Sequence, residues 1–210
     1  SVSSQHYAFV VNAFVSLLKR ADMTRYELFL RETRTYEIIE DVKNFRSEIG
    51  VLFLNSYNRD VLTKMFDDNR LTYTSLFKAR PHIFVSKSNP LAKHEVVSLE
   101  DLEDFPYLSY DQGIHNSFYY SEEILSQIPH KKSIVVSDRA TLFNLLIGLD
   151  GYTIATGILN SNLNGDNIVS IPLDIDDEID IVYLKHEKAT LSKMGEKFLD
   201  NLVKEVTFDN

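Results

Sequence analysis

The chain has 210 residues, and its 22 lysines and arginines against 31 aspartates and glutamates give a formal net charge of -9. Binding to a nucleic-acid backbone requires clustered cations, and the sequence holds no such cluster, so we expect no direct contact with nucleic acid. The chain contains no cysteine, which excludes disulfide frameworks, thiolate zinc sites, iron–sulfur clusters and cysteine nucleophiles.

The first part of the sequence predicts alternating helices and strands. Apolar residues recur at helical spacing over residues 7–19, after a polar loop at 3–6, and the strand that should come before this loop is almost absent, as in an excised fragment. A strand is predicted at 26–30, followed by a loop at 31–33 and a helix near 36–42. Residues 49–54 are almost continuously apolar, which is typical of a strand buried on both faces of a parallel sheet.

The rest of the sequence continues the alternation. Strands are predicted at residues 73–78, 82–86, 105–110, 132–136, 152–155, 168–173 and 179–184. Helices are predicted from 98, with Ser98 as N-cap, and at 118–127, 139–149 and 194–206. This alternation predicts an α/β fold with mostly parallel sheets. The helices at 7–19 and 139–149 are unusually apolar, so each is a candidate for packing on two sides.

Sites for catalysis, metals or nucleotides find little support. The six histidines lack the spacing that places two metal ligands on one helix face, and no Gly-x-Ser-x-Gly motif marks a serine hydrolase. The seven glycines form neither a dinucleotide fingerprint nor a phosphate-binding loop. No apolar stretch approaches the ~20 residues that span a bilayer, so no membrane partner is expected.

A more specific signal is the position of the polar loops. In open α/β sheets, ligands bind at the carboxyl ends of strands, where loops and helix N-termini present N–H donors. The segments at 4–6, 31–33 and 111–117, with Asn55 after another strand, are predicted to line a cleft for a small polar or anionic ligand. Ser4 and Thr33 are equally explained as helix caps, and His6 as an ordinary loop residue.

Several segments, in order, resemble the effector-binding domain of LysR-type transcriptional regulators. The resemblance is carried by SSQHY (3–7), YELFLRET (26–33), IGVLF (49–53), FVSKSNPLA (84–92), SLEDL (98–102) and LLIGLDGYTI (145–154). It implies two Rossmann-like α/β subdomains joined by two crossover strands, as in type 2 periplasmic binding proteins. Subdomain I would comprise residues 1–79 and 179–210, and subdomain II residues 80–178. The sequence departs from the family pattern at Gly50, where an aspartate is usual.

The resemblance also implies a function and a site. A small-molecule effector would bind between the subdomains, and the domain would form a homodimer or tetramer, with the two apolar helices as candidate contacts or as buried core. The expected effector-binding residues are Ser4, Gln5, His6, Tyr7, Arg31, Thr33, Asn55, Tyr110, Asp111, Gly113 and Asn116. Arg31, Arg34 and His6 suggest an anionic or amino-acid-like effector. No cofactor and no metal are expected.

The family's winged helix-turn-helix would precede Ser1, so contact with DNA would belong to that missing domain of a cytoplasmic regulator. Two alternatives stay open. A stand-alone solute-binding protein of a transporter would share the fold, and the upstream sequence would then encode a signal peptide or lipid anchor. A small enzyme on the same scaffold has less support, because no acid–base pair or metal cluster emerges.

Overall fold

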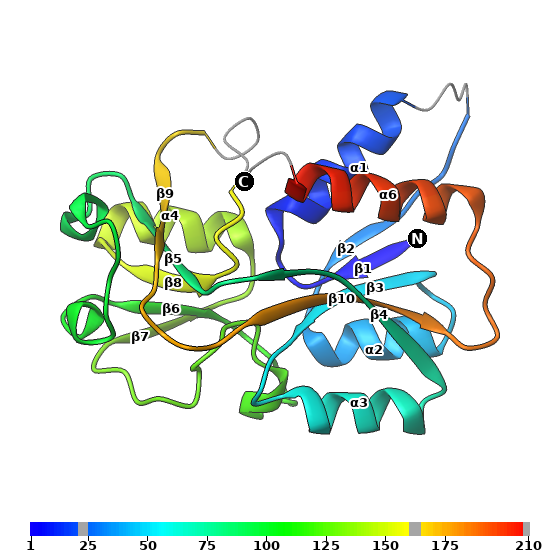
Figure 1. Cartoon of the computed structure of the whole chain (residues 1–210), viewed down its shortest axis with the longest axis horizontal. Coiled ribbons are helices and arrows are strands. Elements are labelled where there is room, and N and C mark those ends of the chain that lie inside the picture. Colours follow the sequence, from blue (N-terminus) through cyan, green and yellow to red (C-terminus); the bar gives the residue numbers. More distant parts are fainter. Residues whose placement is uncertain (21–24, 160–164, 208–210) are drawn as a thin grey trace.

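The computed structural model describes residues 1–20, 25–159 and 165–207, which form two lobes built around separate five-stranded sheets (Figure 1). The strand order of the first sheet is β2-β1-β3-β10-β4, and that of the second is β7-β6-β8-β5-β9. We call the first sheet with its helices lobe I, and the second sheet with its helices lobe II. Within the described residues no helix is long and apolar enough to cross a membrane.

Lobe I is a sheet covered by helices on both faces. Its strands are β1 (Val2–Ser4), β2 (Leu30–Glu32), β3 (Ile49–Leu54), β4 (Leu71–Ala79) and β10 (Ile179–His186). Its helices are α1 (Ala8–Arg20), α2 (Thr35–Lys43), α3 (Arg59–Asp68) and α6 (Lys193–Thr207). Helices α1 and α6 lie on one face, and α2 and α3 lie on the other (Figure 1).

Strand β3 lies at the centre of this sheet and is covered on both faces, which explains its apolar sequence. Val51 and Phe53 face the core under α1 and α6, while Leu52 and Leu54 face the core under α2 and α3. Gly50 lies on the α2 face, where a Cβ atom would come within 2.8 Å of Ile38 Cγ2. A side chain at this position would therefore push α2 away from the sheet.

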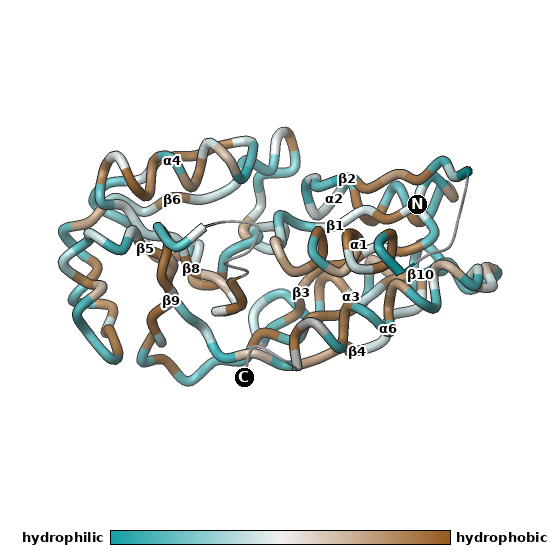
Figure 2. Tube along the Cα trace, turned by 90° about the horizontal axis from the view of Figure 1, so that it is seen from above, coloured by the Kyte–Doolittle hydropathy of each residue, from teal (hydrophilic) through white to brown (hydrophobic). Residues whose placement is uncertain are grey.

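In the part of lobe II that the structure describes, there is one long helix and there are several short ones. Its strands are β5 (His82–Ser86), β6 (Tyr107–Tyr110), β7 (Ser133–Val136), β8 (Tyr152–Ala155) and β9 (Ile168–Pro172). Its helices are α4 (Arg139–Leu149) and the 3₁₀ turns η1 (Pro90–Lys93), η2 (Glu100–Leu102) and η3 (Phe118–Tyr120). Helix α4 lies along the outer side of lobe II (Figure 2). It buries Leu142 and Leu146 against the sheet but leaves Ile147 and Leu149 exposed, at 44% and 48%.

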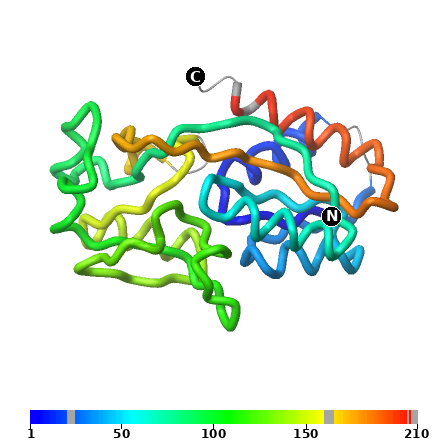
Figure 3. The backbone as a smooth tube through the Cα atoms, turned by 60° about the horizontal axis from the view of Figure 1, so that its bottom comes forward, coloured from blue at the N-terminus to red at the C-terminus, as the bar shows by residue number. Residues whose placement is uncertain are grey.

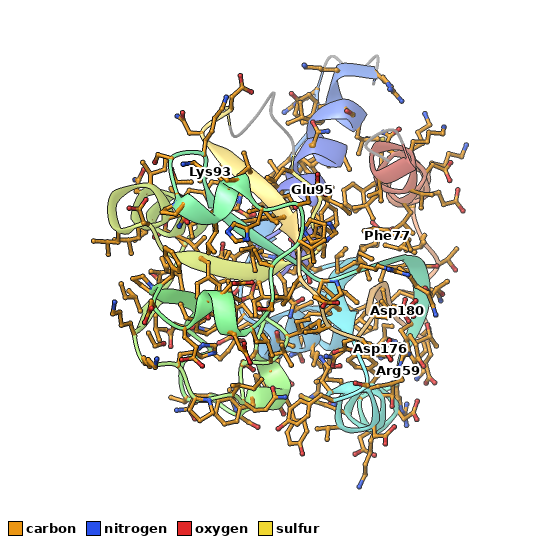
Figure 4. The ribbon with its side chains drawn as sticks, turned by 60° about the vertical axis from the view of Figure 1, so that its left-hand side comes forward. Arg59, Phe77, Lys93, Glu95, Asp176 and Asp180 are labelled. Carbon is orange, nitrogen blue, oxygen red and sulfur yellow. The ribbon has the colours of Figure 1, made fainter. Side chains whose placement is uncertain are left out.

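Two connections link the lobes, between β4 and β5 and between β9 and β10. They run side by side (Figure 3), and the backbone N–H of Leu173 donates to Pro81 O at 3.0 Å. On the lobe I side, Arg59 at the start of α3 pairs with Asp180 of β10 at 2.8 Å (Figure 4). Two adjacent strands therefore connect the sheets, and the lobes also share a hydrophobic core, because one cluster of buried residues includes side chains of both.

The prediction of mostly parallel sheets was wrong. Strand β1 pairs in parallel with β2 and β3, and β6 with β7 and β8, but β10 and β5 run antiparallel to both of their neighbours. The antiparallel strands are the ones next to the two connections. The chain crosses from the first sheet to the second and later back again, and the strand that it enters after each crossing is antiparallel to its neighbours. The alternation of helices and strands in the sequence does not reveal these crossings.

Three local predictions also need correction. The polar loop predicted at 3–6 begins with β1, because Ser3 and Ser4 complete the ladders to β2 and β3. The strand predicted at 26–30 is instead β2, Leu30–Glu32, in register with β1. Helix α3 was missed.

The helices predicted from residue 98 and at 118–127 are short turns. The first is η2, where Ser98 Oγ accepts from Asp101 N at 3.3 Å. The second is η3 followed by irregular chain, in which Leu125 has a left-handed φ of 59°. The side chains of Glu122 and Glu123 accept backbone N–H groups of His6 and Tyr110, at 2.9 and 3.0 Å, so this segment is fixed by contacts with distant strands' ends.

Candidate functional site

A cavity lies between the lobes, with an empty volume of about 620 Å³ that includes space open to solvent. Lobe I contributes Phe9 and Phe53, and lobe II contributes Phe84 and Phe143, so aromatic rings line it from both sides. The polar side chains that line it are His6, Tyr7, Tyr110, Glu122, Glu123, Arg139, Thr153 and Thr156. The cavity is thus an apolar slot with polar groups from both lobes.

The strand ends explain why these polar groups meet. His6 follows the end of β1, and Tyr110 is the last residue of β6. Arg139 begins α4 directly after its N-cap Asp138, whose side chain accepts from Thr141 N at 2.8 Å. The carboxyl ends of parallel strands and the N-termini of the following helices converge on one edge of each sheet, and here the two edges face each other.

His6 and Glu122 form a buried ion pair across the cavity. The Nδ1 atom of His6 lies 2.9 Å from Glu122 Oε2, and the side chains are only 7% and 3% exposed. The backbone N–H of His6 donates to the same oxygen at 2.9 Å, and its ring stacks on Tyr110 at 4.1 Å. Burial alone would lower the pKa of His6, but the hydrogen bond and charge of Glu122 outweigh burial and raise it.

Glu123 differs sharply from its neighbour. It is 4% exposed, and its Oε1 accepts from the backbone N–H of Tyr110 at 3.0 Å, while its Oε2 is buried without a hydrogen-bond partner. Burial and the adjacent charge of Glu122 raise the pKa of Glu123 well above its usual range. The two adjacent carboxyl groups therefore differ: Glu122 is the partner in an ion pair, and the surroundings of Glu123 favour its protonated form.

A chain of hydrogen bonds links Tyr7 to Glu122 behind the cavity wall. Tyr7 Oη donates to Gln5 Oε1 at 2.7 Å, and Gln5 Nε2 donates to Thr35 Oγ1 at 2.7 Å. The backbone N–H of Thr35 donates to Gln112 Oε1 at 3.2 Å, and Gln112 Nε2 donates to Glu122 Oε1 at 3.1 Å. The chain passes from lobe I to lobe II, so the position of Glu122 depends on both lobes.

A second ion pair crosses between the lobes beside the cavity. Arg139 of α4 donates through Nε to Glu32 Oε1 at 3.0 Å and through Nη2 to Glu32 Oε2 at 3.3 Å. This two-point geometry matches the planar guanidinium to the carboxylate. The charge of the only arginine that lines the cavity is thus balanced by a carboxylate at the end of β2.

A further contact between the lobes lies outside the cavity, and we call it the aromatic contact. Tyr36 of α2 stacks on His115 at a centroid distance of 3.5 Å, and Tyr57 stacks on Tyr119 at 4.9 Å. Tyr120 Oη donates to Met65 Sδ at 3.5 Å. Residues 115–120 of lobe II therefore rest on the helices α2 and α3 of lobe I.

The predicted site residues are only partly brought together. His6, Tyr7 and Tyr110 line the cavity, and Gln5 lies buried beneath it as a link in the hydrogen-bond chain. Ser4 is fully buried in β1, and its Oγ lacks a hydrogen-bond partner. None of the other predicted residues is among those that line the cavity: Arg31, Thr33, Asn55, Asp111, Gly113 and Asn116.

Structural contacts account for most of these outlying residues. Asn55 Nδ2 donates to Asp177 Oδ2 at 3.0 Å, which ties β3 to the connection before β10. The backbone N–H of Thr33 donates to Ser4 O at 2.8 Å. Arg31 is exposed on the outer strand, where its Nη1 lies 3.8 Å from Asp41 Oδ2.

No residue of the 111–117 loop lines the cavity, although Gln112 contacts Glu122, which does. Asp111, Gly113 and Asn116 line a separate groove on lobe II. Asp111 pairs with Arg34, whose guanidinium packs on Gly113; a Cβ atom there would lie 2.7 Å from Arg34 Nη1, and φ is +61°. Glycine is therefore required both by the backbone and by the approach of the arginine.

The cations that suggested an anionic effector all have carboxylate partners. His6 pairs with Glu122, and Arg34 pairs with Asp111. Arg31 lies within 3.8 Å of Asp41 and outside the cavity. The basis for expecting an anion is therefore much weaker than the sequence suggested.

The sequence reasoning missed Glu122, Glu123 and Arg139. The two glutamates lay inside a predicted helix, where adjacent carboxylates are ordinarily solvated. Arg139 could have been found, because it follows directly on a strand and begins a helix, the same positional argument that selected His6. The apolar residues that line the cavity could not be predicted, because in the sequence Phe84 and Phe143 look the same as residues of the hydrophobic core.

Three solved structures illustrate what the fold of this chain is similar to. The regulatory domain of reduced OxyR from Pseudomonas aeruginosa shares 12% identity and a TM-score of 0.67, covering 98% of this chain and 94% of that one. The effector-binding domain of QuiR in complex with shikimate shares 17% identity and a TM-score of 0.62, covering 97% of this chain and 94% of that one. HinK, a LysR family transcriptional regulator from Pseudomonas aeruginosa, shares 14% identity and a TM-score of 0.61, covering 98% of this chain and 69% of that one. These likenesses establish a type 2 periplasmic-binding-like fold.

The family is established by sequence. A search of curated proteins gave no significant match, but residues 10–207 match the profile of the LysR substrate binding domain. This match spans nearly the whole chain and decides between the open alternatives, because such domains belong to transcriptional regulators rather than to transporters or enzymes. The chain therefore belongs to the LysR substrate-binding domain family, the ligand-sensing regulatory domains of LysR-type transcriptional regulators.

Proposed function

We propose that a small-molecule effector binds in the cavity between the lobes and stabilises one relative placement of them. The observation that carries this proposal is the His6–Glu122 pair, which spans a cavity lined by side chains of both lobes. A ligand with contacts to both walls binds best to one lobe arrangement, and it shifts the equilibrium by its difference in affinity between arrangements. His6, Tyr7 and Tyr110 are the sequence-predicted residues in a position to contact it.

The division of the chain supports such a movement. We place the subdomain boundaries at residues 79/80 and 178/179, so that subdomain I comprises 1–79 and 179–210 and subdomain II comprises 80–178. These points coincide with the two adjacent connections between the sheets. Two adjacent connections are a candidate hinge, and a rotation about it would have to change the His6–Glu122 and Arg139–Glu32 contacts between the lobes.

A thermal-shift and calorimetric screen of metabolites tests effector binding. Ligands are expected to raise the melting temperature of the chain, and Ala155→Phe, which fills the cavity, is expected to remove that rise. Ala140→Phe on the exposed side of α4 is the matched control and should retain it. Ligands that shift both variants equally would show that the cavity is not the site.

We also propose that the domain forms a homodimer or tetramer in the cytoplasm, and that DNA contact belongs to a separate domain of the full-length regulator. Helix α1 is occupied by the core and by α6, whereas α4 exposes Ile147 and Leu149. Helix α4 is therefore the better of the two candidate contacts.

Sedimentation of the wild type and of Leu149→Asp tests this assembly. The variant should be monomeric at concentrations where the wild type is a dimer. A monomeric wild type, or a variant that remains dimeric, would contradict the assignment of α4 to the interface.

A further inference from the structure

The charges around the cavity leave no positive excess for an anion. Among the residues that line it, the basic groups are His6 and Arg139, and both are paired with carboxylates, Glu122 and Glu32. Glu123 adds a third acidic group with no basic partner. An anionic ligand would therefore have to displace a buried carboxylate or lie beside it, and both are costly in a site of low dielectric.

Glu123 is the group with an unused bonding site. Its Oε1 is occupied by the backbone N–H of Tyr110, and its Oε2 has no partner although it is buried. A neutral carboxyl group retains a proton, and with Oε1 accepting a bond, that proton is carried by Oε2 as an O–H donor. A buried donor without a partner is unfavourable, and a ligand acceptor would remove that cost.

The remaining surface of the cavity suits a flat apolar body. Phe9 and Phe53 of lobe I and Phe84 and Phe143 of lobe II contribute rings from opposite walls. Aromatic rings on both sides favour a planar ligand between them. Thr153 and Thr156 add hydroxyl groups to the lobe II wall without adding charge.

We propose that the cavity selects an uncharged molecule with a planar, apolar body and a carbonyl-type oxygen that accepts a hydrogen bond from the carboxyl group of Glu123. This specificity rests on the proposed function, because it concerns the same cavity. It replaces the anionic effector that the sequence suggested. Burial and the neighbouring Glu122 charge raise the pKa of Glu123 and so favour the protonated form that can donate.

Aromatic probes of similar size test the charge preference. Calorimetry at pH 7 compares acetophenone and phenylacetamide with phenylacetate and benzylamine, which carry a negative and a positive charge. The neutral probes are expected to bind at least tenfold more tightly than either ion. Equal or tighter binding of phenylacetate or benzylamine, or binding of none of the four, would overturn the proposed specificity.

Two variants test the hydrogen bond itself. Glu123→Gln keeps an uncharged N–H donor and should hold the affinity for acetophenone within about threefold, whereas Glu123→Leu removes the donor and should lower it about tenfold. Circular dichroism and a melting curve establish that each variant is folded. Equal affinity of the Gln and Leu variants would overturn the role of Glu123.

The two proposals fail in distinguishable ways. If other classes of metabolite shift the wild type but not Ala155→Phe, the cavity is the effector site and only its proposed specificity is wrong. If ligands shift both of them equally, the site itself is misplaced and the proposed function fails with it.

Discussion

The lobes meet in two regions of opposite character. At the cavity, the His6 and Glu122 side chains are 7% and 3% exposed and form an ion pair, beside the Arg139–Glu32 pair. In the aromatic contact, the rings of Tyr57 and Tyr119 stack at the surface, and Tyr57 is 38% exposed. Buried charges respond strongly to protonation and to a ligand, whereas exposed stacking responds to neither. The first region is thus suited to sensing, and the second to holding the lobes together in any state.

Removing Glu122 should have the largest effect. Glu122→Ala leaves the His6 ring and Gln112 Nε2 without their partner in a buried place. Loss of one member of a buried ion pair costs about 3–5 kcal/mol, which should be seen in the free energy of unfolding by urea. The exposed Glu95→Ala is the control and should change nothing measurable. A loss below about 1 kcal/mol for Glu122→Ala would mean that this pair contributes no more than a surface one.

The second effect is on pH dependence. The folded protein holds Glu123 protonated at pH values where the unfolded chain, with an ordinary pKa near 4.5, has ionised it. The stability from the neutral carboxyl is therefore complete below pH 4.5 and is lost as pH rises through the raised pKa.

Glu123→Gln removes this titration. Its stability relative to the wild type should increase by about 1.4 kcal/mol for each pH unit within that window. Urea unfolding at pH 4, 6 and 8 measures the difference. Parallel pH profiles for the two proteins would show that Glu123 is ionised in the folded state.

The aromatic contact should respond more weakly. Tyr36→Ala removes the stack on His115 and the edge contact with Tyr120, at 5.9 Å, and should cost about 0.5–1.5 kcal/mol beyond the lost apolar burial. Tyr36→Phe keeps the ring and is expected to behave as the wild type. A cost of 3 kcal/mol or more for Tyr36→Ala would place this contact on a level with the buried pair.

The smallest effect is expected at the exposed ion pair. The side chains of Arg34 and Asp111 are 38% and 40% exposed, so Arg34→Ala should cost less than about 1 kcal/mol. Salt screens such pairs, and the difference from the wild type should shrink further in 1 M NaCl. An effect that grows with salt would indicate that packing of Arg34 on Gly113 dominates.

The sequence was informative where one periodicity decided the structure. The burial of β3 on both faces and the helix at 139–149 follow from local residues, and both match the predictions. The antiparallel strands β5 and β10 could not be predicted, because their direction depends on the connections between the sheets.

Only the site residues at or just after the ends of strands were predicted from the sequence. His6 was found from its position after a strand, and Tyr110 was implied by the family resemblance. Glu122 and Glu123 were not, since they lie in irregular chain held by backbone groups more than ten residues away in sequence. Their identification required knowing which strands end beside them.

The place of β10 constrains the order in which the protein matures during synthesis. Strands β3 and β4 do not pair with each other, because β10 lies between them, and β10 is translated only after all five strands of lobe II. A nascent chain on the ribosome can therefore complete lobe II while β4 still lacks its partner. Lobe I, although it is begun first, should be the last to acquire protection from proteases, once residue 186 has left the exit tunnel.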